Sequence, residues 1–331
     1  MPKTKLLSRE HLIVFRRLSQ SLFTVFCLYS GWQFFQFHQW AIGKSAVYIQ
    51  RPPSVEAFLP ISALLGLKRL LFTGQYDPIH PAGLTIFIAA LTIALLVRKG
   101  FCGWICPVGF TSNLAEKAGV RFKTIFKLPF FLDIPLLSLK YILLFFFIYL
   151  IAFKMNLASI DSFLRSPYNI TVDAKMLYFF IAPGKLAATV MIFLLMISFV
   201  IKNFWCRYLC PYGALLGILA CISPFAVKRD SKRCIDCKKC DKICPALISV
   251  SDKSGHVRSL ECIGCLDCVS TCPQEDCLTV RVGPSQKVSP YLIPFLTIAI
   301  FLLFWLIAVS TGHWHNSLPA EIMKRYYEMG V

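Results

Sequence analysis

Long runs of apolar residues, separated by short polar and charged stretches, occupy most of this chain. A helix that crosses the hydrocarbon layer of a bilayer, roughly 30 Å thick, needs about 20 such residues. Five runs can supply them, near residues 18–38, 79–97, 134–153, 185–203 and 288–310. The pattern therefore predicts a mainly α membrane protein with about five transmembrane helices.

The composition agrees with this prediction, because 56% of the 331 residues are hydrophobic. The formal charge of +18 could indicate a nucleic-acid partner, so its distribution matters. With the N-terminus inside, 25 of the 35 Lys and Arg residues fall in cytoplasmic segments. This is the positive-inside pattern. We expect a multi-pass protein of the bacterial inner membrane that contacts lipid, binds no nucleic acid and has its C-terminal tail outside.

Polar character rises sharply between Arg229 and about Gly283, where charges and cysteines crowd together. A small soluble domain is expected there, inserted before the last helix. The chain is thus predicted to comprise a membrane domain (1–228), a cytoplasmic domain (229–284), and a fifth helix with an external tail (285–331).

Two cysteine runs in the insert have the spacing C-x2-C-x2-C-x3-C-P, CIDCKKCDKICP at 234–245 and CIGCLDCVSTCP at 262–273. This spacing is typical of bacterial ferredoxins with two 4Fe-4S clusters, in which the fourth cysteine of each run ligates the other cluster. A zinc ribbon would use paired cysteines instead. We predict an α+β domain of the two-cluster type, with Cys277 as a spare thiol. The first cluster is expected on Cys234, Cys237, Cys240 and Cys272, and the second on Cys262, Cys265, Cys268 and Cys244.

A shorter motif, C-x3-C-P, recurs in the membrane part. RKGFCGWICPVG contains Cys102 and Cys106, and KNFWCRYLCPYG contains Cys206 and Cys210, at an offset of 104 residues. Each copy follows an apolar run, which predicts two parallel repeats with both cysteine pairs at the cytoplasmic membrane surface.

Three interpretations of these four membrane cysteines are open. Together they could enclose one further iron–sulfur cluster. They could instead form redox-active dithiols, or pack as small hydrophobic side chains. In the dithiol interpretation, nearby cations would favour the thiolate forms: Arg98, Lys99, Lys202 and Arg207.

Taken together, CGWICPVG, CRYLCPYG and the paired ferredoxin runs resemble the NapH/MauN/NosR-type family of membrane polyferredoxins, over residues from about 80 to 280. The resemblance implies electron passage between membrane quinol and a redox partner protein or complex, as in a quinol-dehydrogenase-type subunit. The chain has no room for the large external flavin-binding region of NosR-type members. It also continues into a fifth span, whereas NapH-type members usually end after the ferredoxin domain. A cousin group, similar to CcoG, implies oxidase assembly instead.

One outer segment is a candidate quinone and proton site. GQYDPIHP places Tyr76, Asp77 and His80 just before the second apolar run, and a histidine with a carboxylate near lipid could accept protons from a quinol. An ordinary helix start at the interface is the alternative. Lys140, near one end of the third run, is expected to extend its ammonium to the lipid headgroups.

These observations favour a membrane-bound electron-transfer protein that relays electrons between the quinone pool and a redox partner. The alternative is a maturation, assembly or redox-sensing factor for a respiratory metalloenzyme. A transporter is less favoured, because no acidic residue lies in the middle of a predicted span.

Overall fold

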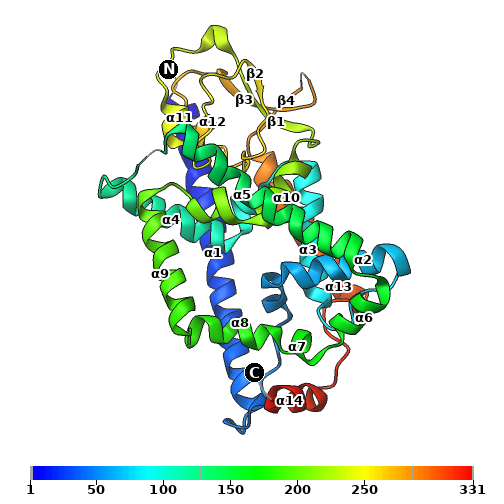
Figure 1. Ribbon diagram of the computed structural model, residues 1–331. Helices are drawn as coiled ribbons and strands as arrows, with labels where there is room; N and C mark the ends of the chain where they lie inside the picture. The colour runs from blue at the N-terminus through cyan, green and yellow to red at the C-terminus, as the bar shows by residue number, and fades with distance from the viewer. Residues whose placement is uncertain (1–2, 127, 285, 330–331) are drawn as a thin grey trace. The chain divides into compact units, whose positions relative to one another are not determined.

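The computed structural model describes residues 3–126, 128–284 and 286–329, with side chains from residue 11 onward (Figure 1). The chain divides into two compact units. The cysteine unit comprises residues 1–24, 90–144 and 194–300, and the second unit comprises 25–89, 145–193 and 301–331. Five helices have part of their length in each: α1 (Lys3–Ala41), α3 (Pro81–Val97), α5 (Phe130–Tyr149), α9 (Lys185–Val200) and α13 (Leu292–Ser310).

The helical part of the cysteine unit also contains α4 (Pro107–Arg121) and α10 (Pro211–Ala220). Each begins at a proline, which is favoured at the first helical position because its fixed φ suits a helix and its missing N–H is not needed there. A short π-helix precedes each of them, Phe101–Ile105 and Trp205–Leu209. Near the second π-helix, Ile201, Phe204 and Tyr208 form a buried cluster.

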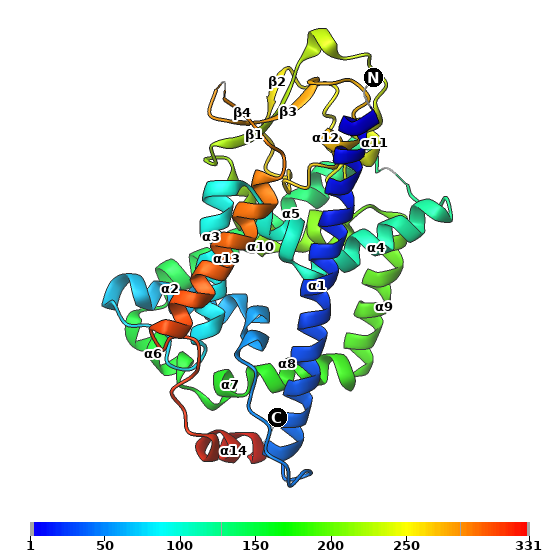
Figure 2. The same cartoon turned by 180° about the vertical axis from the view of Figure 1, so that it is seen from behind.

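A four-stranded antiparallel sheet with the order β2-β1-β3-β4 lies in the same unit. The strands are β1 (Phe225–Arg229), β2 (Gly255–Val257), β3 (Leu278–Val282) and β4 (Gln286–Val288). In the central pair, Val227 is opposite Val280, and both are buried. Two short helices, α11 (Lys239–Ile243) and α12 (Asp267–Thr271), pack on one another beside the sheet (Figures 1 and 2). The sheet begins at Phe225 and ends at Val288, slightly outside the predicted insert.

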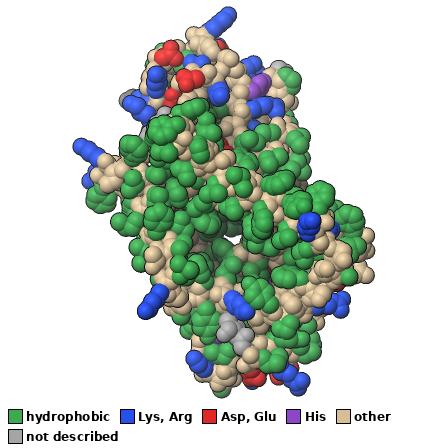
Figure 3. Space-filling model, viewed as in Figure 1, with side chains coloured by type: hydrophobic (Ala, Val, Ile, Leu, Met, Phe, Trp, Pro, Cys, Tyr) green, Lys and Arg blue, Asp and Glu red, His purple; other side chains and the backbone are tan. Residues whose placement is uncertain are grey.

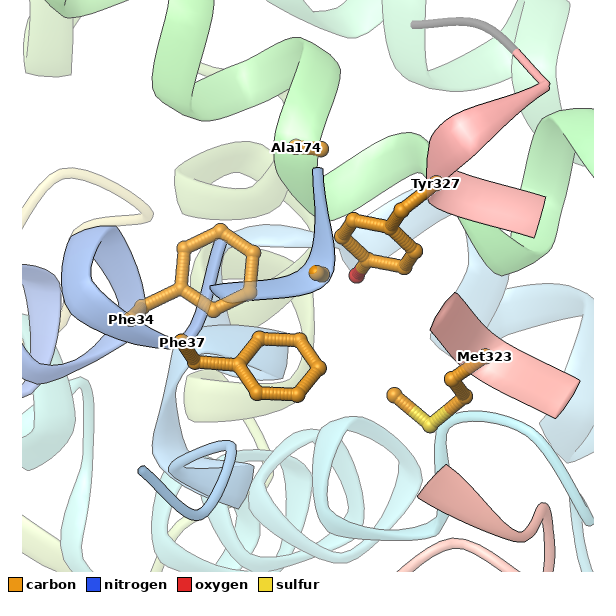
Figure 4. Packing of buried hydrophobic residues seen from close by; sticks show 6 residues of the cluster. Phe34, Phe37, Ala174, Met323 and Tyr327 are labelled. Atoms are coloured by element: carbon orange, nitrogen blue, oxygen red, sulfur yellow. The ribbon is translucent and has the colours of Figure 1, made fainter. Parts of the chain in front are cut away.

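The second unit is built from short helices around the remaining parts of the long ones. They are the 3-10 helix Pro53–Phe58, α2 (Pro60–Thr73), the π-helix Leu150–Lys154, α6 (Leu157–Leu164), α7 (Pro167–Ile170), α8 (Val172–Ile181) and α14 (Ala320–Glu328). One of its buried clusters joins α1, α8 and α14, and Figure 4 shows Phe34, Phe37 and Tyr327 with their rings together. Another contains Leu65, Ile151, Ile160 and Leu164.

Three helical segments of the described chain are long and apolar enough to cross a membrane: His11–Ala41, Phe130–Lys154 and Leu292–Ser310. A fourth span arises if α8 and α9, which meet at a bend of 69°, count as one. The expected second span is α3, which has 17 residues and is shorter than the other three. Exposed apolar side chains such as Phe146 and Met196 suit contact with lipid tails, and apolar side chains cover much of the face in Figure 3.

Candidate iron–sulfur sites

The two ferredoxin runs fold with the same backbone conformation. In each run, the residue before the second cysteine has a positive φ, 50° at Asp236 and 63° at Gly264. The residue after that cysteine also has a positive φ, 54° at Lys238 and 64° at Leu266, and a five-residue helix follows. These reversals wrap the chain so that three closely spaced cysteines can face one point.

The fourth cysteine of each run ends its helix in an extended conformation. Cys244 has φ −65° and ψ 116°, and Cys272 has φ −66° and ψ 120°. The following proline causes this, because its ring disfavours helical geometry in the preceding residue. The side chain is thereby turned away from the three cysteines before it.

Cys272 lies with the three cysteines of the other run. One hollow is lined by all four thiols predicted for the first cluster. Four thiols around one hollow are the donor set of a 4Fe-4S cluster. Cys277, expected as a spare thiol, also lines this hollow. The lining cysteines are Cys234, Cys237, Cys240, Cys272 and Cys277.

Cys244 lies with the cysteines of the second run. Burial, with an added effect of the charge of Cys262, raises the pKa of its thiol to about 11. Burial likewise holds the pKa of Cys268 well above its usual range, with added effects of Cys265, Cys244 and Cys262. Thiols that act on one another in this way are close neighbours, so these four also fit one cluster. Among the described residues, no group of three or more His, Cys, Asp or Glu side chains is placed to hold a single metal ion.

The two membrane motifs have matching local structures. In each, a π-helix carries the first cysteine, the second cysteine is extended, and a helix begins at the proline. The extended residues are Cys106, at φ −62° and ψ 119°, and Cys210, at φ −75° and ψ 103°. The Sγ of Cys210 also accepts a hydrogen bond from the backbone N–H of Gly213 at 3.2 Å.

The four membrane cysteines come together. Burial raises the pKa of Cys102 to about 11, with an added effect of Cys210. Burial raises the pKa of Cys106 to about 12, with added effects of Cys102 and Cys210. The pKa of Cys206 is well above its usual range through burial and then through all three other thiols. Every pair among the four therefore interacts.

These raised pKa values bear on the dithiol interpretation. A reactive dithiol needs thiolate near neutral pH, whereas burial keeps these thiols protonated. A bound metal would deprotonate them outright. Lys99 does lower the pKa of Cys102, but less than burial raises it. Two other expected cations pair elsewhere: Arg207 with Asp133 at 2.7 Å, and Lys202 with Glu116 at 3.2 Å.

The first membrane motif lies directly against the second ferredoxin run. The indole N–H of Trp104 donates to the carbonyl oxygen of Gly264 at 3.1 Å. Gly103 is so close that an added Cβ would lie 2.4 Å from the carbonyl oxygen of Ile263. The guanidinium of Arg16 bonds both the carbonyl oxygen of Gly103 at 3.0 Å and a carboxylate oxygen of Asp267 at 2.6 Å.

The position of Lys140 differs from the one expected from the sequence. Its side chain is fully buried, and its ammonium pairs with Glu261 at 2.5 Å, immediately before Cys262. It therefore does not extend to the lipid headgroups. A buried ammonium is costly without a partner, and Glu261 supplies one. This pair could not be predicted from the sequence, because the two residues are 121 positions apart.

The second membrane motif contacts the end of the first ferredoxin run. The side chain of Asn203 donates to the carbonyl oxygen of Pro245 at 2.9 Å, and Arg207 donates to that of Ala246. These carbonyls belong to the two residues that follow Cys244. Each membrane motif thus borders the cysteines predicted for the second cluster.

The candidate quinone residues lie in the second unit. Tyr76 shares a hydrogen bond with Thr85 at 2.7 Å, and Asp77 accepts the backbone N–H groups of Ile79 and His80. The His80 ring bonds the carbonyl oxygen of Asn169 at 2.7 Å through Nε2.

Its other nitrogen, Nδ1, lies 3.5 Å from Glu56. Glu56 was missed by the sequence reasoning, as were its partners Arg51 and Asp173. The available sign was a pair of opposite charges, Arg51 and Glu56, in a largely uncharged outer segment.

In comparisons with known proteins, the matching regions contain the same cysteines. A family model described as a 4Fe-4S binding domain matches residues 79–129 and 184–229, which contain both membrane motifs. A 4Fe-4S dicluster domain matches 226–273, which contains both ferredoxin runs. No solved structure matches the chain.

The names of similar proteins support the same assignment to iron–sulfur electron-transfer proteins. YccM of Escherichia coli (strain K12), whose name assigns it to electron transport, is 39% identical over 320 residues, 94% of this chain and 88% of the relative. The regulatory protein NosR of Stutzerimonas stutzeri is 32% identical over 64% of this chain and 29% of its own length. The ferredoxin-type protein NapH of Haemophilus influenzae is 29% identical over 59% of this chain and 68% of its own. The chain therefore belongs to the NapH/NosR-type family of membrane polyferredoxins, which carry 4Fe-4S sites for electron transfer.

Proposed function

We propose that this protein relays electrons between membrane quinol and a redox partner in the cytoplasm. The observation that carries the proposal is the contact of both membrane motifs with residues adjacent to cysteines of the second cluster set. Trp104 bonds Gly264, next to Cys265, and Asn203 bonds Pro245, next to Cys244. When bound, 4Fe-4S clusters supply one-electron transfer. The chain itself holds the donor sulfurs and fixes their separation.

The two cluster sets differ in solvent exposure, and this difference supports an order in which electrons pass through them. The second run has no exposed residue, and Gly264, Leu266 and Asp267 are among its buried residues. The first run is open to solvent, and its ligand Cys237 is exposed. Electrons from the membrane would therefore reach the second set (Cys262, Cys265, Cys268 and Cys244) before the first set (Cys234, Cys237, Cys240 and Cys272).

The surroundings of the first set support an anionic partner. Lys238 and Lys239 line the same hollow as the four thiols and are exposed. Lys242, on the same run, and Lys232, just before it, are also exposed. A basic surface next to an exposed cluster ligand favours docking of a protein with an acidic face.

The membrane cysteines Cys102, Cys106, Cys206 and Cys210 are proposed to hold one further iron–sulfur cluster. Their mutual proximity and their burial fit four ligands to one group. Tyr76, Asp77 and His80 are proposed to take part in handling quinone and its protons. The protein is proposed to be a multi-pass inner-membrane protein with its ferredoxin domain in the cytoplasm.

Assembly or redox sensing is the second candidate function, in which the clusters reduce or report without sustained turnover. The discriminating experiment adds a quinol to the anaerobic purified protein and follows the clusters by EPR. Reduction by quinol and reoxidation by quinone support the relay. Clusters that dithionite reduces and quinol does not would contradict it.

The number of clusters is tested separately. Two 4Fe-4S clusters need about eight irons per chain, and a membrane cluster adds to that number. Substituting Cys106 and Cys210 by serine should lower the iron content if these residues are ligands. Cys27→Ser, in α1, is the control and should leave the iron content unchanged.

A further inference from the structure

A group of buried ionisable side chains in the second unit lies outside every cysteine site. Its members are Arg51, Glu56, Asp77, His80 and Asp173, and each is no more than 8% exposed. They come from the loop after α1, the 3-10 helix, the segment before α3, and α8. We call this group the polar cluster.

Arg51 is the centre of the polar cluster. Its guanidinium bonds Glu56 at 2.7 Å and Asp173 at 2.7 Å. Each of these carboxylates has further donors. Glu56 accepts the backbone N–H of Gly83 at 3.0 Å, and Asp173 accepts the hydroxyl of Tyr327 at 2.6 Å. Glu56 and Asp173 therefore each have an ion-pair partner and a further hydrogen-bond donor, which offsets the cost of burying a carboxylate.

Asp77 is much less well stabilised. Its Oδ1 accepts two backbone N–H groups, but its buried Oδ2 has no hydrogen-bond partner. Burial raises the pKa of Asp77, against the opposing effects of His80. A protonated Asp77 would turn this unpartnered acceptor into an O–H donor.

His80 can also take a proton. Its Nε2 donates to the carbonyl oxygen of Asn169 at 2.7 Å, so its Nδ1 is the nitrogen that gains or loses the proton. Nδ1 is buried, lies 3.5 Å from Glu56 and makes no hydrogen bond. Burial lowers the pKa of His80, but the carboxylate of Glu56 raises it by more.

The charges of the polar cluster do not balance without protons. With three ionised carboxylates, one guanidinium and a neutral His80, the net charge is −2. Uncompensated charge is costly inside a protein. Two protons, one on Nδ1 of His80 and one on Oδ2 of Asp77, make the polar cluster neutral.

We propose that the polar cluster is a proton-accepting site with a capacity of two protons, held by His80 and Asp77. The link to quinol rests on the proposed function. Oxidation of one quinol to quinone releases two electrons and two protons. Two ferredoxin clusters, when bound, would take one electron each. His80 and Asp77, which already hold one proton each, would pass these protons to water and regain one each from the quinol.

A purely structural role would use the same Arg51 contacts, so the test must separate the two roles. His80→Gln keeps an N–H that can donate to the carbonyl oxygen of Asn169, and Asp77→Asn keeps the acceptor for the backbone N–H groups. Asp161→Asn is the matched control, because Asp161 pairs with Arg69 at 2.5 Å in the same unit, outside the polar cluster.

The first measurement needs no quinol. Infrared titration of the full-length protein in detergent should show a protonated carboxyl band near neutral pH that Asp77→Asn removes and Asp161→Asn retains. Proton uptake between pH 8 and pH 5 should fall by about one proton in His80→Gln. An unchanged carboxyl band in Asp77→Asn, or unchanged uptake in His80→Gln, would overturn the proposal.

The second measurement follows quinol-driven cluster reduction against pH. We expect His80→Gln and Asp77→Asn to slow it at least tenfold and to alter its pH profile, while dithionite reduction stays normal. If quinol reduces both variants as it does the wild type, the polar cluster is not the acceptor and the proposed relay stands. If quinol fails to reduce the wild type while the titration still finds the two protons, the relay fails and the proton site stands.

Discussion

The indole of Trp104, in the first membrane motif, donates a hydrogen bond across 3.1 Å to the carbonyl oxygen of Gly264, between two cysteines of the second ferredoxin run. Trp104 is fully buried, and Gly264 is buried as well. The two residues are 160 positions apart in the sequence. One cysteine motif is therefore built directly onto another, and the backbone between Cys262 and Cys265 is held by the π-helix that carries Cys102.

Gly103→Ala should disturb this contact. An added Cβ would lie 2.4 Å from the carbonyl oxygen of Ile263, a backbone atom that cannot move aside cheaply. We expect a loss of about 1–3 kcal/mol in the free energy of unfolding, typical of an overpacked site. Quinol-driven reduction of the clusters should also slow. Thermal unfolding in detergent and anaerobic stopped-flow kinetics measure the two effects.

Gly31→Ala is the control for this substitution. An added Cβ at Gly31 meets nothing within 4 Å, and the residue lies inside α1. Alanine is favoured over glycine in a helix by up to about 1 kcal/mol, so stability should be unchanged or slightly higher. Equal effects of the two alanines would contradict the close contact at Gly103.

Arg16→Gln should destabilise the cysteine unit. Arg16 is fully buried and pairs with Asp267 at 2.6 Å. Removing one partner of a buried pair leaves a lone charge and costs about 3–5 kcal/mol. The double variant Arg16→Gln, Asp267→Asn should recover part of this loss, because no lone carboxylate remains. Chemical unfolding of the four proteins in a double-mutant cycle gives the coupling energy; no coupling would mean that the pair does not form.

The same substitution should alter the second cluster site. The charge of Arg16 acts on the thiol of Cys265 and lowers its pKa, against the larger opposing effect of burial. A cation that favours negative charge on a cluster ligand also favours the added electron. Arg16→Gln should therefore make the midpoint potential of the second cluster more negative and leave the first nearly unchanged. An EPR-monitored redox titration resolves the midpoint potentials of the two clusters.

The substitutions Cys244→Ser and Cys272→Ser should each damage the cluster that is bound by the first three cysteines of the other run. Cys244 lies with Cys262 and its neighbours, so its loss should perturb the cluster of the second run. Cys272 lines the hollow of the first run, so its loss should perturb that one. EPR of the reduced protein should show one altered signal in each variant and loss of the coupling between the two clusters. If each serine perturbs the cluster of its own run, the exchange of fourth ligands is wrong.

The local conformation of each cysteine run could be predicted from the sequence because the spacing of its cysteines and proline governs it. Three cysteines within seven residues can only face one point, and a proline after the fourth fixes that residue as extended, as at Cys244 and Cys272. The apolar runs also gave helices at the expected places. Where a helix breaks was harder, since hydropathy does not distinguish α9 alone from α8 and α9 joined by a bend of 69°.

Pairs far apart in the sequence could not be predicted. Arg16 looked like one of several positive charges before the first span, but it is buried against Asp267, 251 positions away. Lys140 resembled a lysine at a lipid surface, but it pairs with Glu261. In both cases the charge pattern of one segment is explained only by a carboxylate from another.

His80→Gln should change how stability depends on pH. The folded-state pKa of His80 is raised: burial opposes the protonated form, but Glu56 favours it by more. The protonated ring therefore contributes stability that is fully present below the unfolded pKa, about 6.5, and is lost as pH rises through the folded value. The difference in thermal midpoint between wild type and His80→Gln should be largest below pH 6 and should shrink as pH rises. Asp161→Asn, tested alongside, should show no such narrowing between pH 5.5 and pH 8.5; a difference for His80→Gln that widens with pH would mean that Glu56 does not hold a proton on this ring.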